Sequence, residues 1–395
     1  MLWSLIIWLA IVVSLLTLGF LYLNRRLIGT MPLSRSRKRT ARVLLAVLFL
    51  VPFVSMMLFQ FMESWGGTWA WVVYVAFGFL SLLLTSVAVR DLVVLTLKGY
   101  EFLVARYASR RIARVDASRR VFLVQSSNLV LLGTAGALTG YGVYQARRMP
   151  GIVKIDVPIE RLPQEFEGFR IVQVTDIHAG LTVRRDWIET IAQQVQDLNP
   201  DMIALTGDLV DGSVGHLRDD VAPLGELTTP GGKFFVTGNH EYYSGVEQWV
   251  EEADRIGYNV LLNAHRLVER NGATIVLAGV TDSTGGNFLD SHTSDPAKAI
   301  VGAPSGSVKI LLAHQPRSLY DALPLGFDLQ LSGHTHGGQF IPWNLLASLG
   351  QPYISGLHRH QNTWVYVSRG TGYWGPPVRL GARSEITVVT LKKTA

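Results

Sequence analysis

The pattern of hydrophobic and polar positions divides the chain near residue 149. Before this point, four apolar runs contain no Asp, Glu, Lys or Arg: Leu2–Leu23, Val43–Met62, Trp69–Val89 and Val121–Tyr144. Each run is long enough, as a helix, to cross a hydrocarbon core of about 30 Å. A helix is needed because lipid offers no hydrogen-bond partner to exposed backbone groups. The sequence therefore predicts a transmembrane region over residues 1–148 with four helices.

Residues 150–395 follow a different pattern, in which short apolar runs alternate with helical or irregular stretches. Eight runs predict strands: Phe169–Thr175, Met202–Thr206, Lys233–Thr237, Thr274–Ala278, Val308–Ala313, Asp328–Leu331, Thr363–Ser368 and Glu385–Leu391. Amphipathic periodicity predicts helices over Asp186–Leu198 and Val246–Ile256. This alternation is typical of an α/β domain in which helices cover sheets.

Basic residues are concentrated between the apolar runs. The net charge is +6, and the segments 24–42 and 98–120 carry seven Lys or Arg residues each. Such clusters can bind nucleic acid, but beside apolar segments they favour a cytoplasmic position instead. With four crossings, the chain from Pro150 onward is then expected on the outer face of the membrane.

The start of the fourth apolar run resembles a twin-arginine export motif. It reads Ser-Arg-Arg-Val-Phe-Leu from Ser118, although it is internal and Val124 stands where Lys is common. An ordinary positive cluster before a helix is the alternative interpretation. Together with the loop charges, the motif predicts a multi-pass protein of a bacterial inner membrane, with residues 150–395 on the periplasmic or extracellular side.

The chain has no cysteine, which excludes disulfides, thiolate catalysis and cysteine metal ligands. Candidate chemistry lies instead in Asp, His and Asn residues that follow the predicted strands, most of them beside glycine. These residues are Asp176, His178, Asp208, Asn239, His240, His314, His334 and His336. Loops at the carboxyl ends of strands are where α/β folds place their ligand sites.

Carboxylate, imidazole and amide ligands suit Mn, Fe or Zn. Two such cations about 3.5–4 Å apart can neutralise a phosphate ester and lower the pKa of a bridging water. The Asp-x-His and His-x-His spacings place two side chains on one side of a strand end, and Asp208 can bridge the ions. Each motif is common by itself, but five of the ten histidines fall in this ordered set.

The order of these motifs resembles that of the calcineurin-like metallophosphoesterases. The resemblance covers about residues 165–392, and Gly333–Gln339 and the C-terminal region are similar to the membrane-linked, twin-arginine-exported bacterial phosphodiesterases. It implies a four-layer αββα sandwich. It also implies a first metal held by Asp176, His178, Asp208 and His336, and a second held by Asp208, Asn239, His314 and His334. By the same resemblance, His240 faces the phosphate and is not a ligand.

The expected function is that of a membrane-anchored enzyme with two divalent metal ions, which hydrolyses phosphate esters and in particular phosphodiesters. A lipid-linked phosphoester or pyrophosphate is an alternative substrate, and a catalytically inactive scaffold or sensor with the same fold is a second alternative. The expected partners are the substrate and the bilayer, with no indication of nucleic acid. The arginines Arg369, Arg379 and Arg383 could bind phosphate or form structural salt bridges, and the loop 340–362 could form a pocket wall or a membrane-facing lid.

Overall fold

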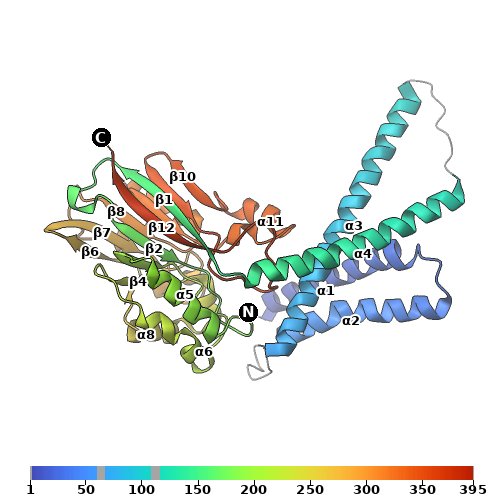
Figure 1. Ribbon diagram of the computed structural model, residues 1–395, viewed down its shortest axis with the longest axis horizontal. Coiled ribbons are helices and arrows are strands. Elements are labelled where there is room, and N and C mark those ends of the chain that lie inside the picture. Colours follow the sequence, from blue (N-terminus) through green and yellow to red (C-terminus); the bar gives the residue numbers. More distant parts are fainter. Residues whose placement is uncertain (1, 60–66, 108–115, 395) are drawn as a thin grey trace. The chain divides into compact units, whose positions relative to one another are not determined.

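The computed structural model describes residues 2–59, 67–107 and 116–394, which form two compact units (Figure 1). The second unit includes the chain from Tyr144 onward. The helices of the N-terminal part are α1 (Leu2–Leu23), the short π-helix η1 (Asn24–Ile28), α2 (Arg35–Phe59), α3 (Gly67–Tyr107) and α4 (Ala117–Arg147).

Within the described residues, three helices are long and apolar enough to cross a membrane: Ile6–Ile28, Gly67–Tyr107 and Ser118–Arg147. The expected second span is not among them. Helix α2 begins with a basic stretch, Arg35–Arg42, and ends at Phe59. The last three residues of the predicted run, 60–62, lie outside the described residues. The predicted basic loop 98–120 is also wrong in part, because α3 continues to Tyr107 and α4 already begins at Ala117.

The pattern of hydrophobic residues predicted only the apolar part of α3 as a helix. The whole of α3 has 41 residues and is about 60 Å long. Beyond this part, a polar cluster connects three helices. The Asp91 carboxylate of α3 accepts a hydrogen bond from Tyr22 Oη at 2.8 Å and pairs with Arg26 Nε at 2.6 Å. Arg90 donates to Asn128 Oδ1 of α4 at 2.5 Å. These contacts satisfy charged groups that would be costly to leave unpaired in an apolar unit.

The second unit contains two six-stranded sheets. The first has the order β1-β12-β2-β3-β4-β5, and the second has the order β10-β11-β9-β8-β7-β6. The strands are β1 (Gly151–Ile159), β2 (Arg170–Val174), β3 (Met202–Leu205), β4 (Lys233–Phe235), β5 (Asn259–Val260), β6 (Ala264–Arg270), β7 (Ala273–Gly279), β8 (Lys309–Leu312), β9 (Leu329–Ser332), β10 (Gly356–His360), β11 (Thr363–Val367) and β12 (Glu385–Lys393). The mixed α/β fold expected from the sequence is confirmed.

A continuous apolar core lies between the two sheets. In β8, Ile310 and Leu312 belong to this core, whereas Leu311 belongs to a separate cluster that includes Ala299 and Ala322 of the covering helices. The alternation follows from the two-residue period of a strand, which turns successive side chains to opposite faces. Both faces of β8 are therefore buried, as an inner strand of a layered sandwich requires.

All eight predicted strands are present, and both predicted helices are confirmed as α5 (Arg185–Asp197) and α8 (Val246–Arg255). The shorter helices are α6 (Val214–Val221), α7 (Asn239–Ser244), α9 (Pro296–Ala299), α10 (Leu319–Ala322) and α11 (Trp343–Gly350). Strands β1, β5, β6 and β10 were not predicted.

The strand directions bring the motif residues to one place. Strands β2, β3 and β4 are parallel to one another, and so are β8 and β9. The carboxyl ends of parallel strands meet at the same edge of a sheet, so the loops that follow them are neighbours. Gln173 Nε2 of the first sheet donates to Ser332 O of the second at 3.1 Å, which joins the two edges.

Candidate metal centre

Five of the predicted ligands have left-handed backbone conformations. Their φ angles are positive: Asp176 54°, His178 53°, Asp208 50°, His334 70° and His336 52°. Asp and His adopt this region more readily than most residues other than glycine. A cluster of such conformations marks a functional site, because the surrounding structure has to hold them in place.

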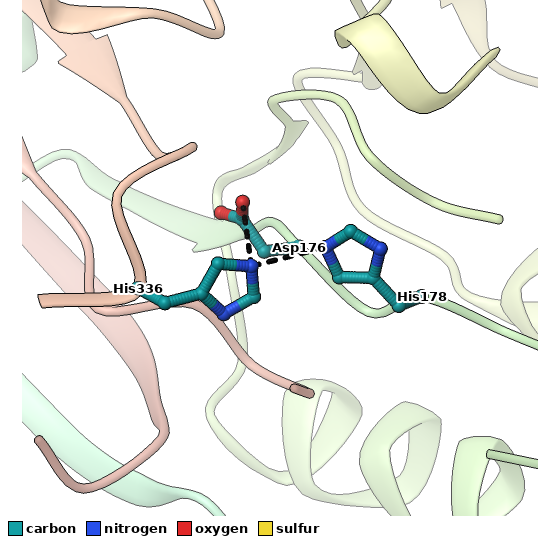
Figure 2. A group of neighbouring side chains, drawn as sticks. All are labelled: Asp176, His178 and His336. Carbon is teal, nitrogen blue, oxygen red and sulfur yellow. Dashed lines mark hydrogen bonds and ion pairs between the residues drawn. The ribbon is translucent and has the colours of Figure 1, made fainter. Parts of the chain in front are cut away.

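The first group of candidate ligands combines Asp176, His178 and His336, all of them buried (Figure 2). His178 Nε2 lies 3.0 Å from His336 Nε2, which in turn lies 3.5 Å from Asp176 Oδ1. One donor atom from each residue lies within 4.8 Å of the others. Residues 158 positions apart therefore converge on one point, in an arrangement that could hold a cation.

A second group combines Asp208, His314 and His334 within the same limit. His314 Nδ1 is bonded to Thr206 O at 2.8 Å, which turns its Nε2 toward Asp208 Oδ2 at 3.1 Å. Burial and then the neighbouring His314 lower the pKa of His334 to about 3. His334 is therefore neutral, and a neutral imidazole is the form that binds metals.

Asp208 lies between the two groups. Its Oδ2 is 3.8 Å from His178 Nε2 of the first group and 3.1 Å from His314 Nε2 of the second. Burial opposes ionisation of this carboxyl group, but the neighbouring histidines, His314 first and then His240, together outweigh it and hold the pKa of Asp208 well below its usual range. Asp208 therefore remains an anion in a position where both groups can share it.

Two buried oxygen atoms in the centre have no hydrogen-bond partner among the described residues: Asp176 Oδ2 and Asn239 Oδ1. A buried polar atom without a partner is rare and costs free energy. A divalent cation would satisfy both atoms, and the surrounding carboxylate, amide and imidazole donors are those that Mn, Fe and Zn accept. The residues present therefore fit divalent metal binding.

His240 lies beside the first group and is held by Asp211. Asp211 Oδ1 is 2.6 Å from His240 Nδ1 and 2.9 Å from His178 Nδ1, so one oxygen positions both rings. Burial disfavours the charged imidazole, but Asp208 and Asp211 outweigh it and raise the pKa of His240 to about 9. His240 is consequently a cation at neutral pH. Geometry alone also allows it to join His178 and Asp208 around an ion.

Glu241 supports the backbone of two ligand loops. Its carboxylate accepts hydrogen bonds from the backbone N–H groups of Gly238 at 2.6 Å, Asp208 at 3.0 Å and Leu209 at 2.7 Å. Burial, followed by the nearby charge of Asp208, raises the pKa of Glu241 to about 8. This residue therefore ties the loop after β3 to the loop after β4.

Gly333 allows the two sheets to approach each other closely. A Cβ atom at this position would lie 2.1 Å from Asp176 Oδ2, an impossible contact. The adjacent His334 N–H donates to Asp176 Oδ1 at 2.8 Å. Glycine is therefore required where the loop after β9 meets the loop after β2.

Two of the three arginines for which phosphate binding and a structural salt bridge were both considered make structural contacts. Arg379 is buried and donates to the carbonyl oxygens of Gly372 and Ala382, at 3.0 and 2.9 Å. Arg369 pairs with Glu385 at 3.2 Å. Arg379 Nη2 also donates to His336 Nδ1 at 3.0 Å, which holds the segment before β12 against the candidate metal centre.

Two aromatic residues beside His240 were not predicted. The ring centroids of Tyr243 and Trp374 lie 5.2 and 5.8 Å from that of His240, and both side chains are at least half exposed. Tyr243 follows His240 by three positions in α7, a spacing that places two residues on one face of a helix. The loop position of Trp374 has no comparable signal in the sequence.

Comparison with known proteins identifies the family. The sequence profile of the family described as calcineurin-like phosphoesterase matches residues 169–338. A Danio rerio protein, "Transmembrane protein with metallophosphoesterase domain", is 41% identical over 67% of this chain and 62% of its own length. The chain therefore spans less than two thirds of that relative.

The match extends over a larger share of the length of two bacterial relatives. A Helicobacter pylori metallophosphoesterase is 36% identical over 75% of this chain and 78% of its own length. The metallophosphoesterase YkuE of Bacillus subtilis is 30% identical over 70% of this chain and 98% of its own. On this evidence and on that of the site, the chain belongs to the calcineurin-like phosphoesterases.

Proposed function

We propose that the protein is a membrane-anchored phosphodiesterase with two divalent metal ions. The first ion would be held by Asp176, His178, Asp208 and His336, and the second by Asp208, Asn239, His314 and His334. The observation that carries this proposal is the position of Asp208 Oδ2 between His178 and His314. One shared carboxylate between two ligand groups is the arrangement that a pair of ions requires.

Bound divalent cations would supply positive charge to bind the phosphate and would lower the pKa of a coordinated water. The chain itself supplies His240, a cation that Asp211 holds at the edge of the ligand groups. In this position, His240 stabilises negative charge on the phosphate and delivers the Nε2 proton to the leaving oxygen. Asp211 keeps the ring oriented for this transfer.

The preference for diesters rests on the surroundings of His240. Tyr243 and Trp374 present exposed aromatic rings beside it. A phosphodiester has a second organic substituent that such rings can bind, whereas a monoester has none. A scaffold without catalysis is disfavoured because the complete donor set, His240 and Asp211 are all in place.

The test uses purified full-length protein with Mn²⁺, Fe²⁺ or Zn²⁺ and small aryl phosphates. We expect metal-dependent hydrolysis, faster for a diester than for the matched monoester. Hydrolysis of the monoester alone would contradict the diester preference. Absence of hydrolysis with every metal, in protein that binds two ions, would contradict catalysis and favour the scaffold.

We also propose that the metal centre faces the outer side of a bacterial inner membrane. The basic residues of 24–42 and 98–120 support this orientation, which requires α2 to cross the bilayer as well. Arg119 and Arg120 lie in the first turn of α4, where a twin-arginine export signal would place them on the inner side. Protease added to intact spheroplasts should digest the catalytic unit, and complete protection until lysis would reverse the orientation.

A further inference from the structure

An apolar surface lies beside the metal centre, formed by Ile341 and helix α11. No residue of α11 is buried. The exposed fractions of its large apolar side chains and of Ile341 are high: Ile341 49%, Trp343 38%, Leu345 64%, Leu346 54% and Leu349 84%. We call these five residues the α11 surface. A compact group of exposed apolar side chains marks a site of interaction with a protein, a ligand or a membrane.

The α11 surface belongs to a stretch without charge. Residues 337–357 contain no Asp, Glu, Lys or Arg, whereas these residue types make up 17% of the whole chain. Exposed segments of soluble domains usually carry charges, because charged groups are favoured in water. Trp343 stands at the start of this helix, and Trp is enriched at membrane interfaces.

Contacts within the second unit connect the α11 surface to the metal centre. Gln339, three residues after the candidate ligand His336, donates from its side chain to Trp374 O at 3.0 Å. The ring of Trp374 lies against that of His240, with centroids 5.8 Å apart. A molecule bound along the α11 surface would therefore reach His240 past Trp374.

The same end of the unit is attached to the apolar helices. Leu380 N donates to Gln339 O at 2.9 Å, and Gly151 N donates to Ser384 O at 2.9 Å, so one short segment joins the start of β1 to the base of α11 (Figure 1). Only residues 148–150 separate α4 from β1. This connection can extend over at most about 14 Å between Arg147 and Gly151.

We propose that the α11 surface inserts into the headgroup region of the bilayer that the apolar helices cross, and that the substrate is a phosphoester carried by a membrane lipid. The second part rests on the proposed function. The short connection after α4 keeps the start of β1 at the membrane, and the contacts through residues 380–384 keep α11 at that same end.

The size of the α11 surface favours a bilayer over a second protein. An eight-residue helix is about 12 Å long and offers roughly a few hundred Å² on one face. Each partner in a stable protein complex buries about 800 Å². A bilayer needs no such complementary area, because it receives apolar side chains individually.

The first experiment measures insertion directly. The chain has no cysteine, so Leu349→Cys gives full-length protein with one site for a bimane label. Val301→Cys is the matched control, since Val301 is 75% exposed and follows α9, which packs near β6 at the sheet edge opposite β10. In nanodiscs of brominated phosphatidylcholine with phosphatidylglycerol, we expect at least twofold quenching at position 349 and none at position 301. Equal quenching at both positions would contradict the proposed insertion. A dimer that forms only when Leu349 is present would contradict it as well.

The second experiment tests the substrate class. Full-length protein with Leu345→Ser and Leu349→Ser is compared with Val301→Ser in nanodiscs that contain phosphatidylglycerol, phosphatidylethanolamine and cardiolipin. We expect the ratio of lipid hydrolysis to hydrolysis of a soluble aryl phosphodiester to fall at least tenfold in the first variant and to stay constant in the second. Hydrolysis of the soluble ester without hydrolysis of any of these lipids would overturn the lipid assignment and leave the proposed function standing. If the unaltered protein hydrolyses neither class, the proposed function fails.

Discussion

The loops of the first sheet and those of the second sheet carry different kinds of candidate metal ligand. After β2, β3 and β4 come both carboxylates and the amide, Asp176, Asp208 and Asn239, together with His178. After β8 and β9 come imidazoles alone: His314, His334 and His336. Both ligand groups that contain a second-sheet histidine also contain a first-sheet carboxylate. The histidines of the second sheet are therefore combined with a carboxylate of the first sheet in both of these groups.

This difference shows how the site avoids a costly concentration of like charge. Negative groups from one sheet meet imidazoles from the other across a buried contact, and the carboxylate of Asp208 is balanced by His314 at 3.1 Å. Backbone groups contribute to the same contact, because His334 N–H donates to Asp176 at 2.8 Å. The contact between the two sheets and the candidate metal centre therefore share the same residues.

The largest effect is expected from the shared carboxylate of the first sheet. Asp208→Asn keeps the shape of the side chain but removes the charge that lies between the two ligand groups. Two cations would then repel each other without compensation, so we expect hydrolysis of an aryl phosphodiester to be abolished and both metals to be lost. Mass spectrometry measures the metal content of the variant, and the rate of aryl phosphodiester hydrolysis measures its activity.

The matched change in the second sheet is His334→Ala. It leaves Asp176, His178 and His336 intact, so about one ion should remain bound. If Asp208→Asn and His334→Ala lose the same amount of metal, the distinction between the two sheets is wrong. Two ions retained in Asp208→Asn would also exclude the bridging role.

A smaller loss is expected from His240→Ala. The variant should lose roughly two to four orders of magnitude in turnover, the usual scale for a general acid or an electrostatic contact. Its metal content should be unchanged, because all seven proposed ligands remain. Loss of one ion instead would show that His240 is a ligand, as its distance to His178 and Asp208 permits.

Asp211→Asn should cost about 10- to 100-fold, the range typical of residues that orient metal ligands. The carboxylate positions His178 and His240 through one oxygen, so the variant should affect both. In a His240→Ala background, the added effect of Asp211→Asn should shrink, since coupled residues are not additive. If the losses of turnover from the two substitutions add fully in the double variant, Asp211 does not act through His240.

The smallest effect is expected on stability, when the metal is removed. Each ion present at about 100 times its Kd stabilises a protein by about 2.7 kcal/mol, which for a unit of this size corresponds to a shift of about 5–10 °C in Tm for each ion. Chelation should lower the Tm of the catalytic unit by this amount. Asp208→Asn protein, which is expected to lack both ions, should show no shift, and an equal shift in both proteins would exclude the centre as the cause.

The sequence predicted the inner strands and the motif residues because both have local patterns. Strand β8 runs from Lys309 into the apolar residues 310–313, and the motif residue His314 follows them directly. The unpredicted strands lack such runs: β6 contains Arg266 and Glu269, and β10 contains only Leu357 among polar neighbours and glycine. Strands at the edge of a sheet tolerate polar residues because one side of the strand faces water. The hydropathy of the sequence therefore does not distinguish edge strands from loops.

The remaining features have two physical causes. Helix α3 continues through Arg90 and Asp91 because a helical backbone satisfies its own hydrogen bonds, whether lipid or water surrounds it. Arg379 donates to backbone carbonyl groups of its own loop, and nothing local in the sequence separates a buried arginine from an exposed one. The continuation of α3 involves a partner far along the chain, because Tyr22 donates to Asp91.

The left-handed backbone of the ligands restricts which amino acids evolution or an engineer can exchange in the centre. Asp176, His178, Asp208, His334 and His336 must each provide a donor atom and tolerate a positive φ. Asp, Asn and His meet both demands, whereas Glu and Cys provide donors without a preference for this conformation. Asn239 and His314 carry no such constraint among the described residues. A library of variants aimed at altered metal selectivity should therefore vary positions 239 and 314 freely and limit the other five positions to Asp, Asn and His.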